Sequence, residues 1–429
     1  MAKTIEVPAL ARVEGEGGLY IAVKDGEARE IRVDIYEPPR FFEGFLQGRF
    51  LQDVPDITAR ICGICPVAYQ MSSVRALENA LDITVSDQVR LMRNLLYCAE
   101  FIESHVLHIF MLQAPDLTGH ESVITLAQDA PEVVTDALRS KKIGNTLLRV
   151  IGGRSVHPVN ACVGGWYRWP DPEELNAMLP DLEWGLEHAI ESVRWAATLP
   201  YPDFEVDYEF VATHNDSEYG ILDGGILSSK YGSIEEKDFE KYFPETHVSH
   251  SNAVHSHDQD GNPYFVGPLA RYNLNFEQLG ETAQKIAKKV KAAPPLNNPY
   301  KSLIARTIEV VEVYDRAIRL IKEYKPKGPS ALKLELKAGE GAAASEAPRG
   351  LLYHRYQVDK DGFIQKAQIM PPTAQNLARM EADLWQLSPM VLKMEHEEAT
   401  LTCEHLLRAY DPCISCATHF LTLTMEELD

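Results

Sequence analysis

Two cysteine pairs with the spacing Cys-x-x-Cys lie near opposite ends of this 429-residue chain. Cys62 and Cys65 stand in the segment Arg-Ile-Cys-Gly-Ile-Cys-Pro, and Cys413 and Cys416 stand in Asp-Pro-Cys-Ile-Ser-Cys. Thiolates at this spacing are soft ligands, suited to zinc, iron–sulfur clusters or another thiophilic metal. If one metal centre takes all four sulfurs, the two ends of the chain must meet. We therefore predict one integrated body rather than separable domains.

The composition restricts the partners and the compartment. The chain is 45% hydrophobic and 24% charged, as globular proteins are, and its net charge of −21 disfavours nucleic acid and anionic membranes. We find no apolar run of the roughly 20 residues that cross a bilayer and no secretory signal, so we expect no membrane insertion. Seven cysteines without dense spacing favour the reducing cytoplasm over a disulfide framework.

The periodicity of apolar residues predicts an α+β fold that is predominantly helical. Alternating residues predict strands at 19–23 and 31–35, joined by a tight turn at 24–27, and a second hairpin around 359–362. Ser86 and Pro115 are expected to bound a long apolar helix through the middle of the core. Further helices are expected to begin at Pro66 and to cover 171–198, 275–291, 300–324 and 373–409.

We divide the single domain 1–429 into five parts. They are a β-rich N-terminal part (1–60), a helical core (61–200), a β and loop excursion (201–275), a second helical core with an arginine loop and the second cysteine pair (276–419), and a C-terminal tail (420–429). Residues 338–345 are alanine, glycine and serine, with Glu340 as the one larger residue. They fit either a flexible linker or an ordered approach to the segment Glu346–Gly350.

The residues around the cysteines argue against a structural zinc site, the first alternative for two such pairs. Structural zinc mostly organises small modules that lack a core, and this chain has ample apolar content. The pairs are also flanked by Arg60, Asp411 and His419, for which a closed zinc site has no use. A helix start at Cys65 and the nearby Arg60 favour thiolates, and Arg349 is a candidate cation for anionic ligands.

Eight motifs, in order, resemble those of the large subunit of nickel–iron hydrogenases. The group they resemble is soluble, cytoplasmic and bidirectional, and includes NAD(P)-linked enzymes and sulfhydrogenases. The resemblance implies the large-subunit fold, with long central helices and peripheral β-rich pieces. The motifs are Ala11–Gly15, Arg40–Gly44, Arg60–Cys65, Glu103–His105 through Pro115–Asp116, Gly153–Arg154 with His157–Pro158, Glu346–Gly350, Pro372–Asn376 and Asp411–His419.

The resemblance implies a role for each site residue. Cys62, Cys65, Cys413 and Cys416 would bind nickel, and Cys65 and Cys416 would also bridge to an iron that carries cyanide and carbon monoxide. Arg349, Pro372 and Thr373 would line the pocket for these ligands, with Arg349 and Thr373 as donors. Glu14 would relay protons, and Asp116 and Asp411 would support Arg349 and the ligands. Glu43, His419 and the backbone carbonyl of Ile369 would bind a structural magnesium or similar ion.

The implied reaction is H₂ ⇌ 2H⁺ + 2e⁻, with electrons leaving through an iron–sulfur small subunit to NAD(P) or to sulfur and polysulfide. Cys98, Cys162 and Cys403 are isolated, and no glycine-rich nucleotide loop is present. Iron–sulfur clusters, flavin and nicotinamide are therefore expected in partner subunits only. The resemblance also implies nickel-insertion factors and an endopeptidase that removes residues 420–429.

Two features depart from the pattern or leave alternatives. Tyr69 stands where many relatives have a histidine that supports the metal by hydrogen bonding. His247, His250, His255 and His257 lie close together, but we prefer a polar loop to a second metal site because the spacing fits such a loop and no carboxylate or cysteine stands among the four histidines.

Competing functions are a hydrogen-sensing regulatory subunit with the same metal site and low turnover, and the quinone-site subunit of respiratory complex I. The second shares the fold but lacks the cysteine pairs, so the four thiols here argue against it.

Overall fold

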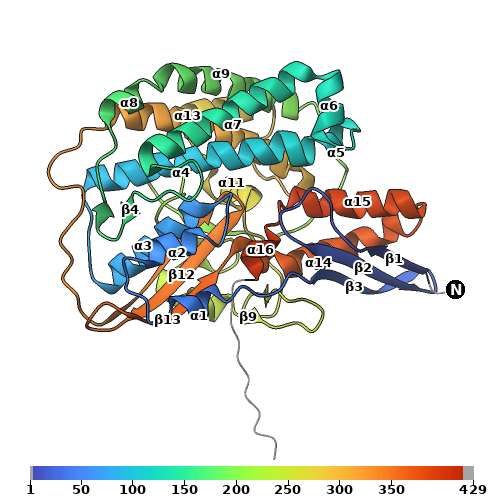
Figure 1. The fold of residues 1–429 in the computed structure, drawn as a ribbon. Helices are drawn as coiled ribbons and strands as arrows, with labels where there is room; N and C mark the ends of the chain where they lie inside the picture. The colour runs from blue at the N-terminus through green and yellow to red at the C-terminus, as the bar shows by residue number, and fades with distance from the viewer. Residues whose placement is uncertain (1–2, 419–429) are drawn as a thin grey trace, which may run out of the picture.

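A layer of long helices covers one side of the protein, at the top of Figure 1. The computed structural model describes residues 3–418, so the predictions for His419 and the tail lie outside the described residues. Helix α4 (Asp87–Leu107) packs between α7 (Pro131–Gly152) and α13 (Ser302–Glu323), and α13 also packs on α9 (Leu179–Ala196). The long helix through the core is thus confirmed.

The central helix starts as predicted and ends later. The Ser86 hydroxyl accepts the Val89 amide at 3.4 Å, a typical N-cap. Pro115 does not end the helical run, because one π-helical turn, η1 (His108–Gln113), places it in the first turn of α5 (Ala114–Thr118). The run stops at Gly119, whose φ of +73° is left-handed.

The same run, Asp87–Thr118, is long and apolar enough to cross a membrane, which the sequence analysis did not recognise. In the structure 83% of its apolar window is buried inside the protein. A helix that is buried on all sides in a large protein is apolar on all sides, so its composition resembles that of a membrane-spanning helix.

The N-terminal hairpin is confirmed. Strands β1 (Lys3–Val7), β2 (Gly17–Lys24) and β3 (Glu27–Ile35) form an antiparallel sheet in that order. Asp25 and Gly26 both have positive φ, as a two-residue hairpin turn of this twist requires. Helix α14 (Pro372–Val391) packs on β3, and α15 (His396–Ala409) packs on β1, as Figure 1 shows at the right.

The segment 338–345 is ordered, so the flexible-linker alternative is wrong. It belongs to β11 (Gly339–Ala347), which forms an antiparallel sheet with β12 (Gly350–Val358) and β13 (Ile364–Met370) inside the part expected to be helical. The predicted hairpin joins β12 to β13. Strand β11 lies directly on helix α3 (Pro66–Ala80), and a Cβ on Gly341 would stand 2.3 Å from the Ala76 carbonyl oxygen. Its small residues permit close packing.

Three predicted helices are shorter or interrupted. The stretch 171–198 divides into α8 (Pro172–Asn176) and α9, and the stretch 373–409 divides into α14 and α15. The stretch 275–291 follows α11 (Pro268–Asn275) and holds the 3₁₀ turn η3 (Phe276–Gln278) and the short helix α12 (Glu281–Lys289). Pro172 and Pro268 are each the first residue of their helix, where a missing amide costs least.

The remaining elements are short, and the stretch 201–275 holds small strands and turns together with the helices α10 (Phe239–Tyr242) and α11 and the 3₁₀ turn η2 (Glu236–Asp238). The strands are β4 (Ala161–Cys162), β5 (Gly165–Trp166), β6 (Val211–His214), β7 (Gly225–Ser228), β8 (Gly232–Ile234), β9 (Glu245–Thr246) and β10 (His255–Ser256). The other helices are α1 (Phe42–Leu46), α2 (Val54–Ala59), α6 (Val123–Asp129) and α16 (Ile414–Ala417), with the 3₁₀ turn η4 (Pro299–Lys301).

One apolar cluster runs through the described chain, from Ile5 in β1 to Ala417 in α16. It includes Cys62, Cys65, Cys413 and Cys416, all of them buried. The two ends of the chain therefore meet inside the hydrophobic core, and the cysteine loops are walled in by it.

The contact between β11 and α3 can be tested by adding one methyl group. We expect Gly341→Ala to lower the free energy of unfolding by about 1–3 kcal/mol, the usual cost of overpacking, because both nearest atoms belong to the α3 backbone. The measurement is urea unfolding followed by circular dichroism. Gly225→Ala in β7 is the matched control, since its nearest neighbour would be 4.0 Å away. Equal stability of the two variants would contradict close packing of β11 on α3.

Candidate metal centre

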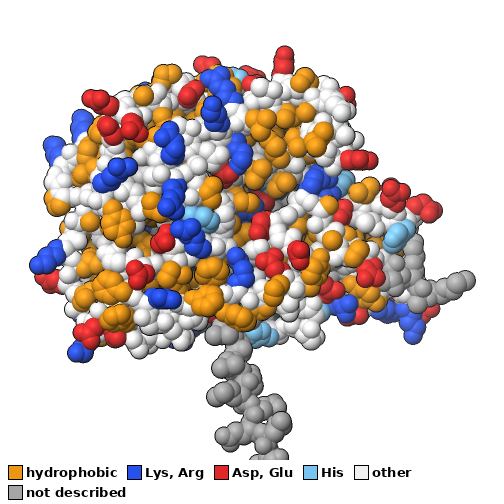
Figure 2. Space-filling model, in the orientation of Figure 1, with side chains coloured by type: hydrophobic (Ala, Val, Ile, Leu, Met, Phe, Trp, Pro, Cys, Tyr) orange, Lys and Arg blue, Asp and Glu red, His pale blue; other side chains and the backbone are white. Residues whose placement is uncertain are grey.

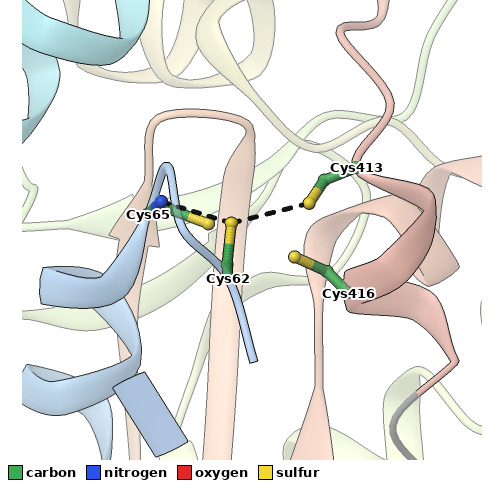
Figure 3. Close-up of side chains that lie close together, drawn as sticks. All are labelled: Cys62, Cys65, Cys413 and Cys416. Atoms are coloured by element: carbon green, nitrogen blue, oxygen red, sulfur yellow. Dashed lines mark hydrogen bonds between the residues drawn. The ribbon is translucent and has the colours of Figure 1, made fainter. Parts of the chain in front are cut away.

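Four buried sulfur atoms from the two ends of the chain lie within 4.8 Å of one another. The Sγ atoms of Cys62 and Cys413 are 3.6 Å apart, and Figure 3 shows all four sulfurs turned toward a common centre. Two come from the loop between α2 and α3, and two from the start of α16. All four cysteines are free thiols. The two cysteine pairs therefore converge, as predicted.

The first pair is positioned by the start of α3. Cys65 is its N-cap and Pro66 its first residue, as predicted. The carboxylate of Glu100 on α4 accepts the amides of Val67 (2.6 Å) and Ala68 (3.1 Å), so it satisfies two free donors of the first turn. The sequence analysis missed Glu100, because nothing in its local pattern marks a cap supplied by another helix.

Arg40 ties the two cysteine loops together. Its guanidinium donates to the Ile61 carbonyl at 2.8 Å and to the Ser415 carbonyl, and its backbone amide donates to the Thr418 carbonyl. Ile61 precedes the first pair, and Ser415 lies inside the second. Arg40 belongs to one of the recognised motifs, but the sequence analysis gave it no role. A fixed fork of donors suits this bridging between two loops.

Glu14 lies beside the second pair. Its Oε2 is 3.1 Å from the Cys413 Sγ and also accepts the Ser415 amide at 3.1 Å. Its backbone carbonyl accepts the Ile414 amide at 2.9 Å, which pairs the N-terminal segment with the start of α16. The carboxylate is thus held in hydrogen-bonding contact with one of the four thiols.

Arg349 is the buried cation of the site. Its Nη2 is 3.0 Å from the Asp411 Oδ1, its Nε donates to the Asp411 carbonyl at 2.8 Å, and its Nη1 has no hydrogen-bond partner. Burial alone would lower the pKa of Arg349, but the charges of Asp411 and of the thiolates raise it well above the ordinary value. The unpaired Nη1 leaves one buried donor for an anion.

Thr373 and Pro372 begin α14 next to this arginine. The Thr373 hydroxyl accepts the Cys413 amide at 2.9 Å. Pro372 packs against Gly350, the residue after Arg349, where an added Cβ would lie 3.0 Å from the Pro372 Cβ. These residues and Arg349 therefore wall one side of the sulfur cluster.

Asp116 does not contact Arg349, so that part of its predicted role is corrected. Its carboxylate binds Arg408, with Arg408 Nε to Asp116 Oδ2 at 2.8 Å, and also binds Arg12. It links α5 to α15 and to the N-terminal segment. Arg60 is likewise not beside the thiols, because it pairs with Asp56 at 3.1 Å on the surface.

Glu43 accepts the Ile369 amide at 2.7 Å, which brings two of the residues expected at the magnesium site together. Burial raises the pKa of Glu43 to about 7. Their third expected partner, His419, lies outside the described residues.

Electrostatics differ among the four thiols. Hydrogen bonding from Cys413 lowers the pKa of Cys62, and the amides of Ile64 and Cys65 also donate to its sulfur at 3.3 Å each. Burial raises the pKa of Cys413. Cys62 is therefore the sulfur best prepared to be a thiolate.

Tyr69 is buried under the four sulfurs, and its hydroxyl has no hydrogen-bond partner. Burial and the charges of the four thiolates raise its pKa well above the ordinary value. Its ring lies 5.8 Å from that of His354. The neutral hydroxyl is a buried donor close to the four thiols.

Comparison with known proteins decides between zinc and nickel. The sequence model described as nickel-dependent hydrogenase matches residues 40–136 and 234–419. The chain belongs to this family. Sulfhydrogenase 1 subunit alpha of Pyrococcus furiosus is 32% identical over 98% of both chains, and sulfhydrogenase 2 subunit alpha of the same organism is 34% identical over 98% of this chain and all of that one. Both belong to the group that the motifs resemble.

Solved structures show the same fold. A structure titled NAD⁺-reducing [NiFe]-hydrogenase in the H₂-reduced state superposes with a TM-score of 0.87, at 24% identity, over 97% of this chain and 99% of that one. The chain is thus the catalytic large subunit of a nickel-dependent hydrogenase, an oxidoreductase acting on H₂. The zinc, sensor and complex I alternatives are not favoured. Four soft sulfur donors, with a buried donor at Arg349 Nη1, fit such a centre.

The unpartnered hydroxyl of Tyr69 makes a testable prediction about stability. In the metal-free precursor, Tyr69→Phe should leave the free energy of unfolding unchanged or raise it by about 1 kcal/mol, because it removes a buried polar group that has no partner. Tyr97→Phe is the control. It loses a 2.6 Å hydrogen bond to Ser345 and should be destabilised by about 1 kcal/mol. Equal losses in urea unfolding would mean that the Tyr69 hydroxyl is paired.

Proposed function

We propose that the four sulfurs hold nickel and that Cys65 and Cys416 also bridge to an iron carrying cyanide and carbon monoxide. The observation that carries this is the convergence of four buried sulfurs with the Glu14 carboxylate 3.1 Å from one of them. Arg349 Nη1 and the Thr373 hydroxyl supply donors for cyanide, and Pro372 gives the pocket an apolar wall. Asp411 keeps Arg349 in place through two contacts.

Nickel bound by thiolates supplies the Lewis acid at which H₂ is split heterolytically. The chain's own task is then to receive and remove a proton. The Cys413 Sγ takes the proton, and Glu14 Oε2, in hydrogen-bonding contact with it, carries it away from the core. The Ser415 amide fixes Glu14 in this position.

The partners follow from what this chain lacks. Cys98, Cys162 and Cys403 are single, buried thiols, so the described residues hold no second cluster of cysteines. Electrons therefore pass to an iron–sulfur small subunit, and from there through flavin- and nicotinamide-binding subunits to NAD(P), or to sulfur or polysulfide. The Pyrococcus relatives are themselves named as alpha subunits of sulfhydrogenases, which supports this assignment.

One apolar surface suits the small subunit. Phe41 and Phe45 in and beside α1 are 41% and 57% exposed, and Phe363 in the β12–β13 turn is 42% exposed and packs on Phe50 at 5.8 Å between ring centroids. Protein–protein interfaces are enriched in aromatic side chains of this kind. Figure 2 shows one face of the molecule, on which groups of apolar side chains alternate with charged ones.

We further propose that Glu43, His419 and the Ile369 carbonyl bind magnesium or a similar ion, and that an endopeptidase removes residues 420–429 after nickel insertion. The buried Glu43, with its pKa raised to about 7, is a carboxylate that a cation would stabilise. The protein acts in the cytoplasm, in keeping with its free thiols.

Infrared spectroscopy and metal analysis test the centre directly. The matured protein should show cyanide and carbonyl stretching bands and contain one nickel per chain. Cys413→Ser should lose nickel and keep its tail, as seen by mass spectrometry, whereas Cys162→Ser should do neither. Stoichiometric zinc without these bands would overturn the proposal.

The proton relay is tested by isotope exchange. Glu14→Gln should retain nickel and the infrared bands, since the amide oxygen can still accept from Ser415, but H/D exchange with solvent should fall by about 100-fold or more. Glu16→Gln, an exposed neighbour, is the control. Exchange at the normal rate in Glu14→Gln would exclude Glu14 as the relay.

A further inference from the structure

Two histidines and a glutamate form a second group of metal-ligating side chains, separate from the cysteines. His250 lies in the loop between β9 and β10, His255 begins β10, and Glu381 lies in the middle of α14. One ligand atom from each lies within 4.8 Å of the others. The carboxylate whose absence counted against a metal site is 126 residues beyond His255 in the chain, where sequence proximity could not reveal it.

The carboxylate of Glu381 offers one oxygen to each imidazole. His250 Nε2 is 2.9 Å from Oε1, and His255 Nδ1 is 3.9 Å from Oε2. The first contact is a hydrogen bond, and the second is too long to be one. Tetrahedral zinc, at about 2.0–2.1 Å from each ligand, separates its ligand atoms by about 3.3 Å, between these two distances. The ring centroids of the histidines are 5.4 Å apart, with planes at 84°.

The group is held rigidly by its surroundings. Glu381 Oε1 also accepts the Val33 amide of β3 at 2.9 Å. The histidine loop is tied to the same strand, because the Asn252 amide donates to the Ile35 carbonyl at 2.7 Å. Ligands fixed in advance by second contacts are a mark of metal sites. The side chains of His250 and Glu381 are 20% and 16% exposed, which leaves a route from solvent.

An ion pair between His250 and Glu381 does not explain His255. This ring is 2% exposed, its Nε2 has no hydrogen-bond partner, and its Nδ1 faces the carboxylate at 3.9 Å. Burial, with the charges of His250 and His257, lowers the pKa of His255 to about 3, so the ring is neutral. A neutral imidazole is the form that binds metals.

We propose that His250, His255 and Glu381 bind one divalent transition-metal ion of the zinc class, which fastens the β9–β10 loop to α14. Two imidazoles and a carboxylate suit zinc and similar ions, whereas magnesium and calcium prefer oxygen ligands alone. Three protein ligands and partial exposure leave a fourth position for water. The site stands independently of the nickel centre, since it shares no residue with it.

The test uses the assembled, nickel-loaded complex, in which the four cysteines are occupied. After dialysis against a chelator, titration calorimetry with Zn²⁺ should show one site per large subunit. X-ray absorption at the zinc edge should show nitrogen and oxygen neighbours and no sulfur. Binding should be weaker by at least about 100-fold in His250→Ala and in Glu381→Gln, because loss of an outer-shell partner alone costs about 10–100-fold.

His120→Ala is the matched control. His120 Nε2 forms a similar contact with Asp129 at 3.0 Å but belongs to no three-ligand group among the described residues, so its loss should leave zinc binding unchanged. Zn²⁺ should also slow amide hydrogen exchange in residues 246–256 of the parent protein and not of His250→Ala. No zinc uptake by the parent, uptake equal in all variants, or sulfur neighbours at the zinc would each overturn the proposal.

Discussion

The structure depends on holding two sulfur-bearing loops against each other without a disulfide, although Cys62 and Cys413 are 351 residues apart in sequence. Between the sulfurs of the two loops, those of Cys62 and Cys413 are in contact at 3.6 Å. Further attraction comes from groups without sulfur. Arg40 donates to a carbonyl of each loop, and the Glu14 backbone pairs with the start of α16. Both groups belong to the first fifty residues, so this N-terminal segment connects the two cysteine loops through hydrogen bonds.

Two buried arginines of this core are paired with buried carboxylates. Arg349 is 2% exposed and rests on the equally buried Asp411, and Arg271 is shared by Glu309 and Glu346 at 2.7–2.8 Å. Removing one member of such a pair leaves an uncompensated charge, which is strongly destabilising. The arginine beside the sulfurs is thus fixed before any ligand arrives. Its unused Nη1 is consequently presented in a set direction.

Local sequence signals were enough wherever one segment determines its own shape. The Asp25-Gly26 turn, the Ser86 cap and the Pro66 helix start follow from backbone chemistry within a few residues, and all three are as predicted. The metal residues were identified through motifs, and the structure places Glu14 and Arg349 with the cysteines. The roles of Pro372, Thr373, Glu43 and His419 remain predictions.

What the sequence did not reveal depends on contacts between distant segments. The small residues of β11 left a flexible linker open as an alternative because their partner, α3, is more than 250 residues away. Proline usually ends a helix, but a π-helical turn before Pro115 lets the helical run continue. Asp116 was expected to support Arg349 and instead binds Arg408. Glu100 and Glu381 act on segments far from themselves in the chain. None of these carries a local signature.

The cap that Glu100 places on α3 has a consequence for the order of assembly. The turn that carries Cys62 and Cys65 is held by α4 and by its own amides, all within residues 62–100. The other sulfurs need Thr373, Glu14 and Arg40 to take their position. The first two sulfurs are therefore positioned by contacts that are close in sequence, whereas the other two are positioned only when distant segments have packed, so the half-site of Cys62 and Cys65 can form first during folding.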